Sequence, residues 1–252
     1  IKSTVSDKDM IFKGNDGGSE VQAAYFDMSN AGTAIFGTGT ASIDVEGSHA
    51  QLQVMGDDNN DSSVSIARFD DGGNSPRLRF MKSRNGTIGS NTIVQDGDQL
   101  GNIGFIGADG NDFNSVGARI YAEVDGTPGQ DDMPTKLVFQ TTADGAAAPS
   151  GTQMQINNTG AVFINDTANA NQTVGLTVNM GANDNEIITL KSSDVTHAMT
   201  GQTEADTFAT IVKGNNTQGM PTFTGYSSGT RGLQLVGNHT TDNTSQASDG
   251  NS

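Results

Sequence analysis

Short apolar runs alternate with polar, glycine-rich loops along the whole chain. The three clearest runs lie in its middle and read LGNIGFI at 100–106, ARIYAEV at 118–124 and KLVFQ at 136–140. In the second run Ile120 and Ala122 fall on one parity, and Arg119 and Tyr121 fall on the other. Since successive side chains of a strand point to opposite faces, this period of two predicts β-strands. Runs of this length, bounded by turn residues, are typical of strands.

The connections between these runs have the chemistry of tight turns. They contain the pairs Asp125-Gly126, Pro128-Gly129 and Asp144-Gly145. Glycine tolerates positive φ, and proline presets the first corner of a turn. The third run keeps the same period, with Leu137 and Phe139 opposite Val138. We therefore expect one compact antiparallel unit with polar loops.

Further short runs flank this unit on both sides. The run VQAAYFDM at 21–28 fits either a strand or a helical turn, and strand is preferred because no convincing cap surrounds it. The most basic segment is 77–84, in which Leu78 and Phe80 share a face. Other strands are expected within 34–47, 50–56 and 63–69, and in the runs GLTVNMG, EIITLKSS, DTFATIVKG and RGLQLVG after residue 165. The spacing of these later runs predicts β-elements stacked along an axis.

The middle of the chain also resembles a known family. The segments GDQLGNIGFIGADG, GARIYAEVDGTPGQDDMPTKLVFQTTADG and TQMQINNTGAVFIN occur in this order at 97–110, 117–145 and 152–165. Their turns and spacing resemble a module common in tail fibres of tailed bacteriophages, and the resemblance covers roughly the middle third of the chain. It implies a structural module in a virion tail fibre. It brings no catalytic motif with it.

Composition points to a β-protein with little core of its own. Only 33% of residues are hydrophobic and 6% aromatic, there is no Trp, and 33 residues are Gly. A globule of 252 residues normally has more to bury. Disorder is the other interpretation of this composition, but apolar alternation recurs throughout the chain. We therefore expect a thin, extended β architecture that completes its core by association.

Charge and residue usage exclude several functions. The net charge of −16 argues against nucleic acid and against adsorption to an anionic membrane, because both need a basic face. The absence of Cys excludes disulfides, cysteine-based zinc sites and thiol catalysis. No run reaches the roughly 20 apolar residues of a membrane span. Because the sequence starts at Ile1 and ends in the polar run DNTSQASDGNS, we expect it to be a piece of a longer polypeptide.

Catalytic chemistry has few candidates. The three histidines, His49, His197 and His239, neighbour no motif, and HExxH, GxSxG, P-loop and dinucleotide fingerprints are all missing. A glycosidase needs two carboxyls roughly 5–10 Å apart, one with a raised pKa. Glu123 and Asp125 are the pair that comes nearest to this requirement. We expect them instead to be surface residues of a strand and its turn, and we predict no catalytic residue.

Two acidic loops are candidate calcium sites. In DDNNDSS, Asp57, Asn59 and Asp61 alternate like the start of an EF-hand loop, but Ser62 and Arg68 stand where Gly and Glu are needed. The second loop, GADGND, offers the side chains of Asp109, Asn111 and Asp112. Asx-turns explain both loops without a metal ion. We therefore predict neither a metal nor a cofactor.

The sequence predicts an all-β, elongated fibre of short antiparallel strands. Its central module is expected to be β-sandwich-like, with flanking intertwined or stacked β-repeats. The expected divisions are 1–62, an N-terminal β fibre segment; 63–165, the central module; 166–239, a β-repeat stalk; and 240–252, a polar tail. The expected partners are two further copies in a homotrimer, other virion tail proteins and a host surface receptor or glycan. The alternatives are a non-viral extracellular adhesin or filament subunit and a polysaccharide-depolymerising tailspike.

Overall fold

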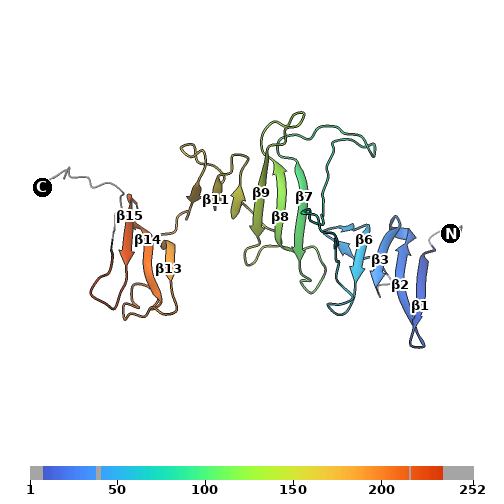
Figure 1. Cartoon of the computed structure of the whole chain (residues 1–252), viewed down its shortest axis with the longest axis horizontal. Helices are drawn as coiled ribbons and strands as arrows, with labels where there is room; N and C mark the ends of the chain where they lie inside the picture. The colour runs from blue at the N-terminus through green and yellow to red at the C-terminus, as the bar shows by residue number, and fades with distance from the viewer. Residues whose placement is uncertain (1–7, 38–40, 216, 235–252) are drawn as a thin grey trace. The chain divides into compact units, whose positions relative to one another are not determined.

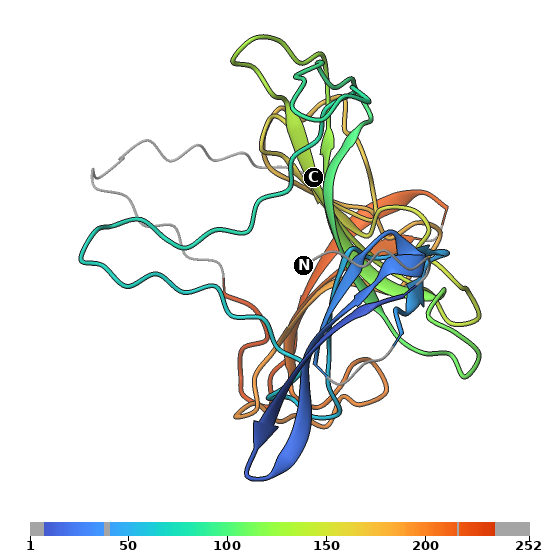
Figure 2. The same ribbon diagram turned by 90° about the vertical axis from the view of Figure 1, so that its right-hand side faces the viewer.

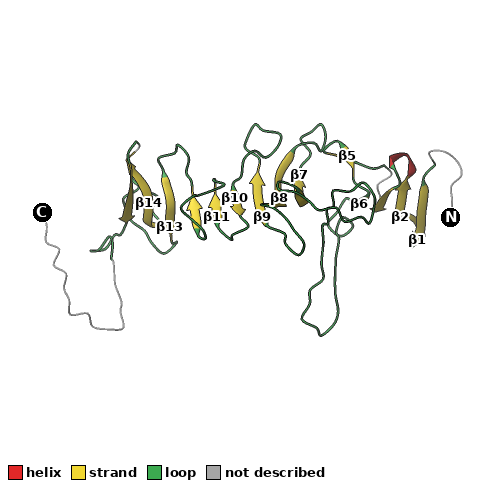
Figure 3. Ribbon diagram, turned by 90° about the horizontal axis from the view of Figure 1, so that it is seen from above, coloured by secondary structure: helices red, strands yellow, loops and turns green. Residues whose placement is uncertain are grey.

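A computed structural model describes residues 8–37, 41–215 and 217–234 of the chain. Within these residues the secondary structure is almost entirely β, with a single three-residue 3-10 turn, η1 (Met28–Asn30) (Figure 3). The all-β prediction is therefore confirmed. The chain divides into two compact units between Asn179 and Met180, and each is described by itself. The expected four-part division stays a prediction.

The first sheet has the strand order β1-β2-β3-β6. Its strands are β1 (Met10–Asp16), β2 (Ser19–Asp27), β3 (Thr33–Gly37) and β6 (Leu52–Met55). Strands β1 and β2 form a hairpin in which Gly17 and Gly18 both have positive φ, as a two-residue type I′ turn requires. The preference for strand over helix at 21–28 is confirmed by β2. A two-stranded ladder, β4 (Asp44–Val45) and β5 (Ser48–His49), lies in the connection from β3 to β6.

The second sheet has six strands in the order β12-β11-β10-β9-β8-β7 (Figure 1). They are β7 (Gln99–Ile106), β8 (Val116–Val124), β9 (Thr135–Thr141), β10 (Met154–Ile156), β11 (Val162–Ile164) and β12 (Leu176–Val178). The three central strands and their antiparallel pairing are confirmed, and only β11 and β12 run parallel. The sandwich-like arrangement expected for this module is not what the described residues form, because these six strands make one layer.

The second unit contains a three-stranded antiparallel sheet, β13-β14-β15. Its strands are β13 (Glu186–Lys191), β14 (Thr207–Asn215) and β15 (Gly219–Gly225). Strands β13 and β14 were expected from the sequence, and β15 was not. The expected strand RGLQLVG is not formed at 231–234, and its remaining residues lie outside the described part of the chain.

The strand expected at 63–69 is also not formed, and the basic segment 77–84, in which Leu78 and Phe80 share a parity, forms none either. Every residue from 56 to 82 is exposed and belongs to no ladder. Figure 2 shows this segment, in teal, leaving the sheets of the first unit and returning to them. The physical reason is that alternation permits a strand, but a strand also needs a neighbour for its backbone hydrogen bonds. No described segment of the same chain provides that neighbour.

Candidate assembly surface

One face of the six-stranded sheet is apolar from edge to edge. Residues opposite one another on neighbouring strands share a face, so their identities form rows across the sheet. One row is Ile103, Ile120, Phe139, Met154, Ile164 and Val178. The adjacent row on the same face is Gly101, Ala122, Leu137, Ile156, Val162 and Leu176. We call these two rows the open apolar face, because all twelve positions lack a polar side chain and none is buried.

Several large side chains of this face are strongly exposed. Leu176 at the β12 edge is 59% exposed, and Ile103 at the β7 edge is 44% exposed. Full burial of one such side chain is worth about 1.5–3 kcal/mol. A contiguous apolar surface of this kind marks an interaction site in soluble proteins.

The opposite face of the same sheet is buried by loops of the same chain. Its middle row includes Tyr121, Val138, Gln155 and Phe163, all of them buried, and Phe163 is only 1% exposed. The covering loops satisfy the polar members, since the Gln155 side chain donates to the Thr167 carbonyl at 2.9 Å. An antiparallel sheet normally buries its apolar face and leaves the mixed one to solvent. In the single chain this arrangement is reversed.

The first sheet has the same organisation. Its rows are Met10, Phe26, Ala34 and Leu52, and next to them Phe12, Ala24, Phe36 and Val54. Of these eight residues only Ala24 is buried, and Phe36 is 46% exposed. The rings of Phe12 and Phe26 make an edge-to-face pair at 5.8 Å. Tyr25 and Ile35, which lie on the other face, are buried.

The sheet of the second unit repeats the pattern. Ile188, Ile211 and Phe223 form one row, and Leu190, Ala209 and Gly225 form the next. None of them is buried, and Phe223 is 62% exposed. The other face carries a row of threonines in which Thr210 is buried. Each of the three larger sheets therefore has two adjacent apolar rows that the described residues leave largely unburied.

The candidate carboxylate pair is held by a lysine. Lys136 Nζ lies 2.6 Å from Glu123 Oε1 and 3.9 Å from Asp125 Oδ1. Burial lowers the pKa of Lys136, but the hydrogen bond and charge of Glu123 outweigh it and raise that pKa above its ordinary value. The ammonium therefore stays charged between the two carboxyls. Glu123 and Asp125 are thus ion-pair partners of the same lysine.

The two candidate calcium loops form Asx-turns. Asp58 Oδ1 accepts from the backbone N–H of Asn60 at 2.6 Å, which closes the first turn. Asp109 accepts from the N–H groups of Asn111 and Asp112 at 2.9 and 3.1 Å. These backbone hydrogen bonds lower the pKa of Asp109. Across residues 8–37, 41–215 and 217–234, no three acidic or histidine side chains converge as a metal site would require.

The histidines have structural surroundings. His197 is buried, with Nε2 2.7 Å from the Thr207 carbonyl and its ring stacked on Tyr226 at 5.6 Å. Its Nδ1 accepts from the Met199 N–H at 3.3 Å. His49 is exposed beside the Ser42 hydroxyl. His239 lies outside the described residues.

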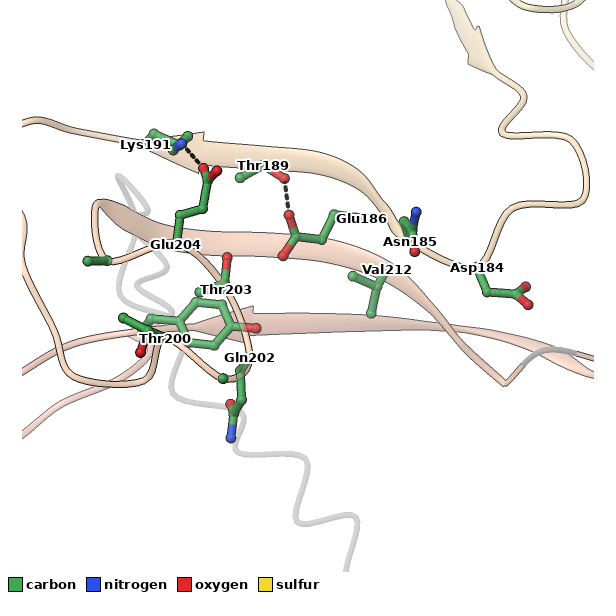
Figure 4. Close-up of a pocket in the computed structure, with 13 residues that line it drawn as sticks. Asp184, Asn185, Glu186, Thr189, Lys191, Thr200, Gln202, Thr203, Glu204 and Val212 are labelled. Atoms are coloured by element: carbon green, nitrogen blue, oxygen red, sulfur yellow. Dashed lines mark hydrogen bonds and ion pairs between the residues drawn. The ribbon is translucent and has the colours of Figure 1, made fainter.

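A polar groove of about 1070 Å³ lies in the second unit, between β13 and the loop that precedes β14 (Figure 4). Its charged groups are paired, since Lys191 contacts both Glu204 and Asp206, and Glu186 accepts from the Thr189 hydroxyl at 2.7 Å. The hydrogen bonds that Lys191 donates to Glu204 and Asp206 raise the pKa of this lysine. The groove therefore offers hydrogen-bonding groups that are already paired with one another.

The sequence predicted which residues share a face of the central strands, but not which face is exposed. The shared faces of Ile120 with Ala122, and of Leu137 with Phe139, are confirmed by the register. The loop that follows β11 covers the other face, where the Thr167 carbonyl accepts a hydrogen bond from the Gln155 side chain. No pattern in the sequence indicated which face this loop would cover. Strand β1 was also missed, although Met10, Ile11 and Phe12 form an apolar cluster just before the glycine-rich run at 14–19.

Comparisons with known proteins give structural matches only. No protein-family model matches the sequence, and a comparison with curated proteins finds no match. Two solved structures of the carboxy-terminal domain of the bacteriophage T5 L-shaped tail fibre are similar to the chain. The first has a TM-score of 0.39 at 10% identity and covers 66% of this chain and 82% of that chain. The second, which includes the intramolecular chaperone domain, has a TM-score of 0.39 at 11% identity and covers 73% of this chain and 69% of that chain.

Proposed function

We propose that the chain is a structural segment of a bacteriophage tail fibre that assembles as a homotrimer and presents contacts to the host surface. The observation that carries this proposal is the uncovered apolar face on each of the three larger sheets. Burying these faces stabilises the protein, and other copies of the same chain carry matching apolar faces that can bury them. The resemblance of residues 97–165 to tail-fibre modules supports the phage context.

In this proposal, the polar loops contact the host surface. The apolar faces are occupied by assembly, so the outer surface consists of Asp, Asn, Ser, Thr and Gly-rich turns. The groove beside β13 provides carboxylate, hydroxyl and ammonium groups that can form hydrogen bonds with a surface glycan or protein. The role is mechanical and adhesive, and we propose no catalysis by this chain.

Localisation tests the proposal against its main alternative. An antibody raised against the purified chain should label the tail fibres of intact phage particles in negative-stain electron micrographs. Label on filaments of uninfected bacteria, with none on particles, would support a bacterial adhesin instead. The neighbouring genes provide a second test, because tail-protein genes should flank this one.

A cleavage assay tests the tailspike alternative. The purified assembly should release no reducing ends from the capsular or lipopolysaccharide chains of the host. If it does release them, Glu123→Gln separates the candidate pair from an unrelated site, with Glu20→Gln on the exposed β1–β2 hairpin as the matched control. Loss of cleavage in the first variant alone would revive the glycosidase interpretation.

A further inference from the structure

The segment at 63–82, which we call the arm, has the sequence of two strands but forms no ladder with any other described segment. Val64 and Ile66 share one parity of the outgoing limb, and Leu78 and Phe80 share one parity of the returning limb. The linker DDGGNSP between the limbs closes through an Asx-turn, since Asp70 Oδ1 accepts from the Gly72 N–H at 2.9 Å. In Figure 3 the two limbs run out from the first unit and back. A loop of this length that keeps strand periodicity is unusual and indicates a function.

The apolar side chains of the arm are among the most exposed in the described chain. Phe69 is 96% exposed and Met81 is 90% exposed. Val64, Ile66 and Leu78 are exposed as well. The arm thus exposes six large apolar side chains. Like the open apolar face, such a surface is typical of a site that binds a partner.

The returning limb already shows which surface suits it. Phe80 lies against Gly101 of β7, so closely that a Cβ on Gly101 would come 2.5 Å from the Phe80 Cβ. Together with Ile103, Ile120 and Leu137, Phe80 lines an apolar hollow on the open apolar face. One arm residue therefore packs on this face within its own chain, while the rest of the arm extends past it.

Charge points to a second copy of the chain as the partner. Within the arm, the basic residues Arg68, Arg77, Arg79 and Lys82 stand against Asp70 and Asp71, which gives a net charge of +2 and leaves −18 on the rest of the chain. Arg68 pairs with Asp70, so the remaining basic residues all lie on the returning limb. The returning limb is thus a basic element of an acidic protein, and another copy of the chain is an acidic partner that fits it. In length, one seven-residue limb spans about 23 Å, which crosses about five strands at their usual spacing.

We propose that the arm of one copy packs across the open apolar face of the six-stranded sheet of a neighbouring copy. The side chains of Val64, Ile66 and Leu78 then fill positions over that face. This inference rests on the proposed function, since it assumes assembly. It goes further by assigning the contact between copies to one segment and one face.

Disulfide trapping tests the inference on a clean background, because the chain has no cysteine. Two differently tagged versions are co-expressed, one with Ile66→Cys and the other with Ile103→Cys, Leu137→Cys or Ile164→Cys. After mild oxidation, at least one combination should give a covalent adduct that carries both tags. Val174→Cys, an exposed apolar position outside the sheets, serves as the matched control and should give none.

A second variant measures what the arm contributes. Replacing residues 63–82 with a flexible Gly/Ser linker of equal length should raise the concentration of half-dissociation about tenfold or more. Arg77→Glu with Arg79→Glu should raise it as well, whereas Arg231→Glu should leave it unchanged. The wild-type mass separates the two proposals. An oligomeric wild type without a mixed adduct overturns the arm inference alone. A monomeric wild type overturns both.

Discussion

At the scale of single residues, Asp27 couples the first sheet to pH. Its side chain is buried at the end of β2 and accepts from the Ser29 hydroxyl at 2.6 Å, the Asn30 amide at 2.7 Å and the Ser42 hydroxyl at 3.0 Å. These hydrogen bonds, led by that of Ser29, hold the pKa of Asp27 far below its usual range. A carboxyl with a lowered folded-state pKa stabilises the fold above its unfolded pKa of about 3.9, and this contribution is lost as pH falls.

We therefore expect Asp27→Asn to remove part of the acid sensitivity of the fold. Thermal melts by circular dichroism from about pH 5 to pH 2 should show a smaller fall in Tm than the wild type shows. Asp16→Asn, on the exposed β1–β2 hairpin, is the matched control and should melt like the wild type. An unchanged pH profile in Asp27→Asn would mean that this carboxylate does not stabilise the sheet.

Substitutions of two phenylalanines distinguish effects on folding stability from effects on assembly. Phe163 is buried by its own chain, so Phe163→Ala should cost about 3–5 kcal/mol of folding stability at any protein concentration. Phe139 lies half-buried on the open apolar face, so Phe139→Ala should act mainly on assembly. Denaturation at several concentrations, together with the mass of each variant, measures the difference. Equal effects at all concentrations would contradict the assignment of Phe139 to an interface.

At the scale of elements, the parallel pairing of β3 with β6 depends on Gly37. Its φ is 110°, and a Cβ at this position would collide with the Met55 carbonyl oxygen. Both the backbone strain and the collision disfavour any other residue. Gly37→Ala should destabilise the sheet by about 1–3 kcal/mol in urea unfolding. Gly14→Ala in β1 is the control, since its Cβ would meet no atom within 4 Å, and equal loss in both variants would contradict the explanation.

The sequence allowed most strands to be predicted, but not which faces are covered. Alternation and turn residues are local, so β7, β8 and β9 were found with nearly their observed bounds. Pairing is not local, and the alternating residues Val64 and Ile66 form no ladder because no described segment of the chain lies beside them. The same limit applies to Phe139, whose apolar character was clear while its exposure depended on where the loops after β9 and β11 lie.

At the scale of the whole molecule, the proposed trimer would approach a host cell with a large negative charge. Three chains of −16 carry −48 together, and bacterial surfaces are usually anionic as well. Screening shortens this repulsion, since the Debye length falls from about 30 Å at 0.01 M salt to about 10 Å at 0.1 M. Binding of fluorescent assemblies to host cells should therefore strengthen as NaCl rises through this range. Binding that is strongest at low salt would refute the repulsion argument.

The same assay tests whether divalent cations bridge carboxylates of the assembly to the cell surface. A chelator should then reduce the amount of fluorescent assembly that is bound per cell at a fixed NaCl concentration. Adding back Ca²⁺ in excess of the chelator should restore it, and this is the control. Indifference to the chelator would remove the bridging cation and leave hydrogen bonds from the polar loops as the contact.

The central claim is that copies of the chain cover the apolar faces which a single chain leaves open. Its most direct test is the mass of the purified wild-type chain by multi-angle light scattering at micromolar concentration. The single chain weighs 26.1 kDa, so a trimer has a mass of about 78 kDa, which is three times that value. We predict the trimer mass. A compact, stably folded monomer of 26.1 kDa would contradict the account.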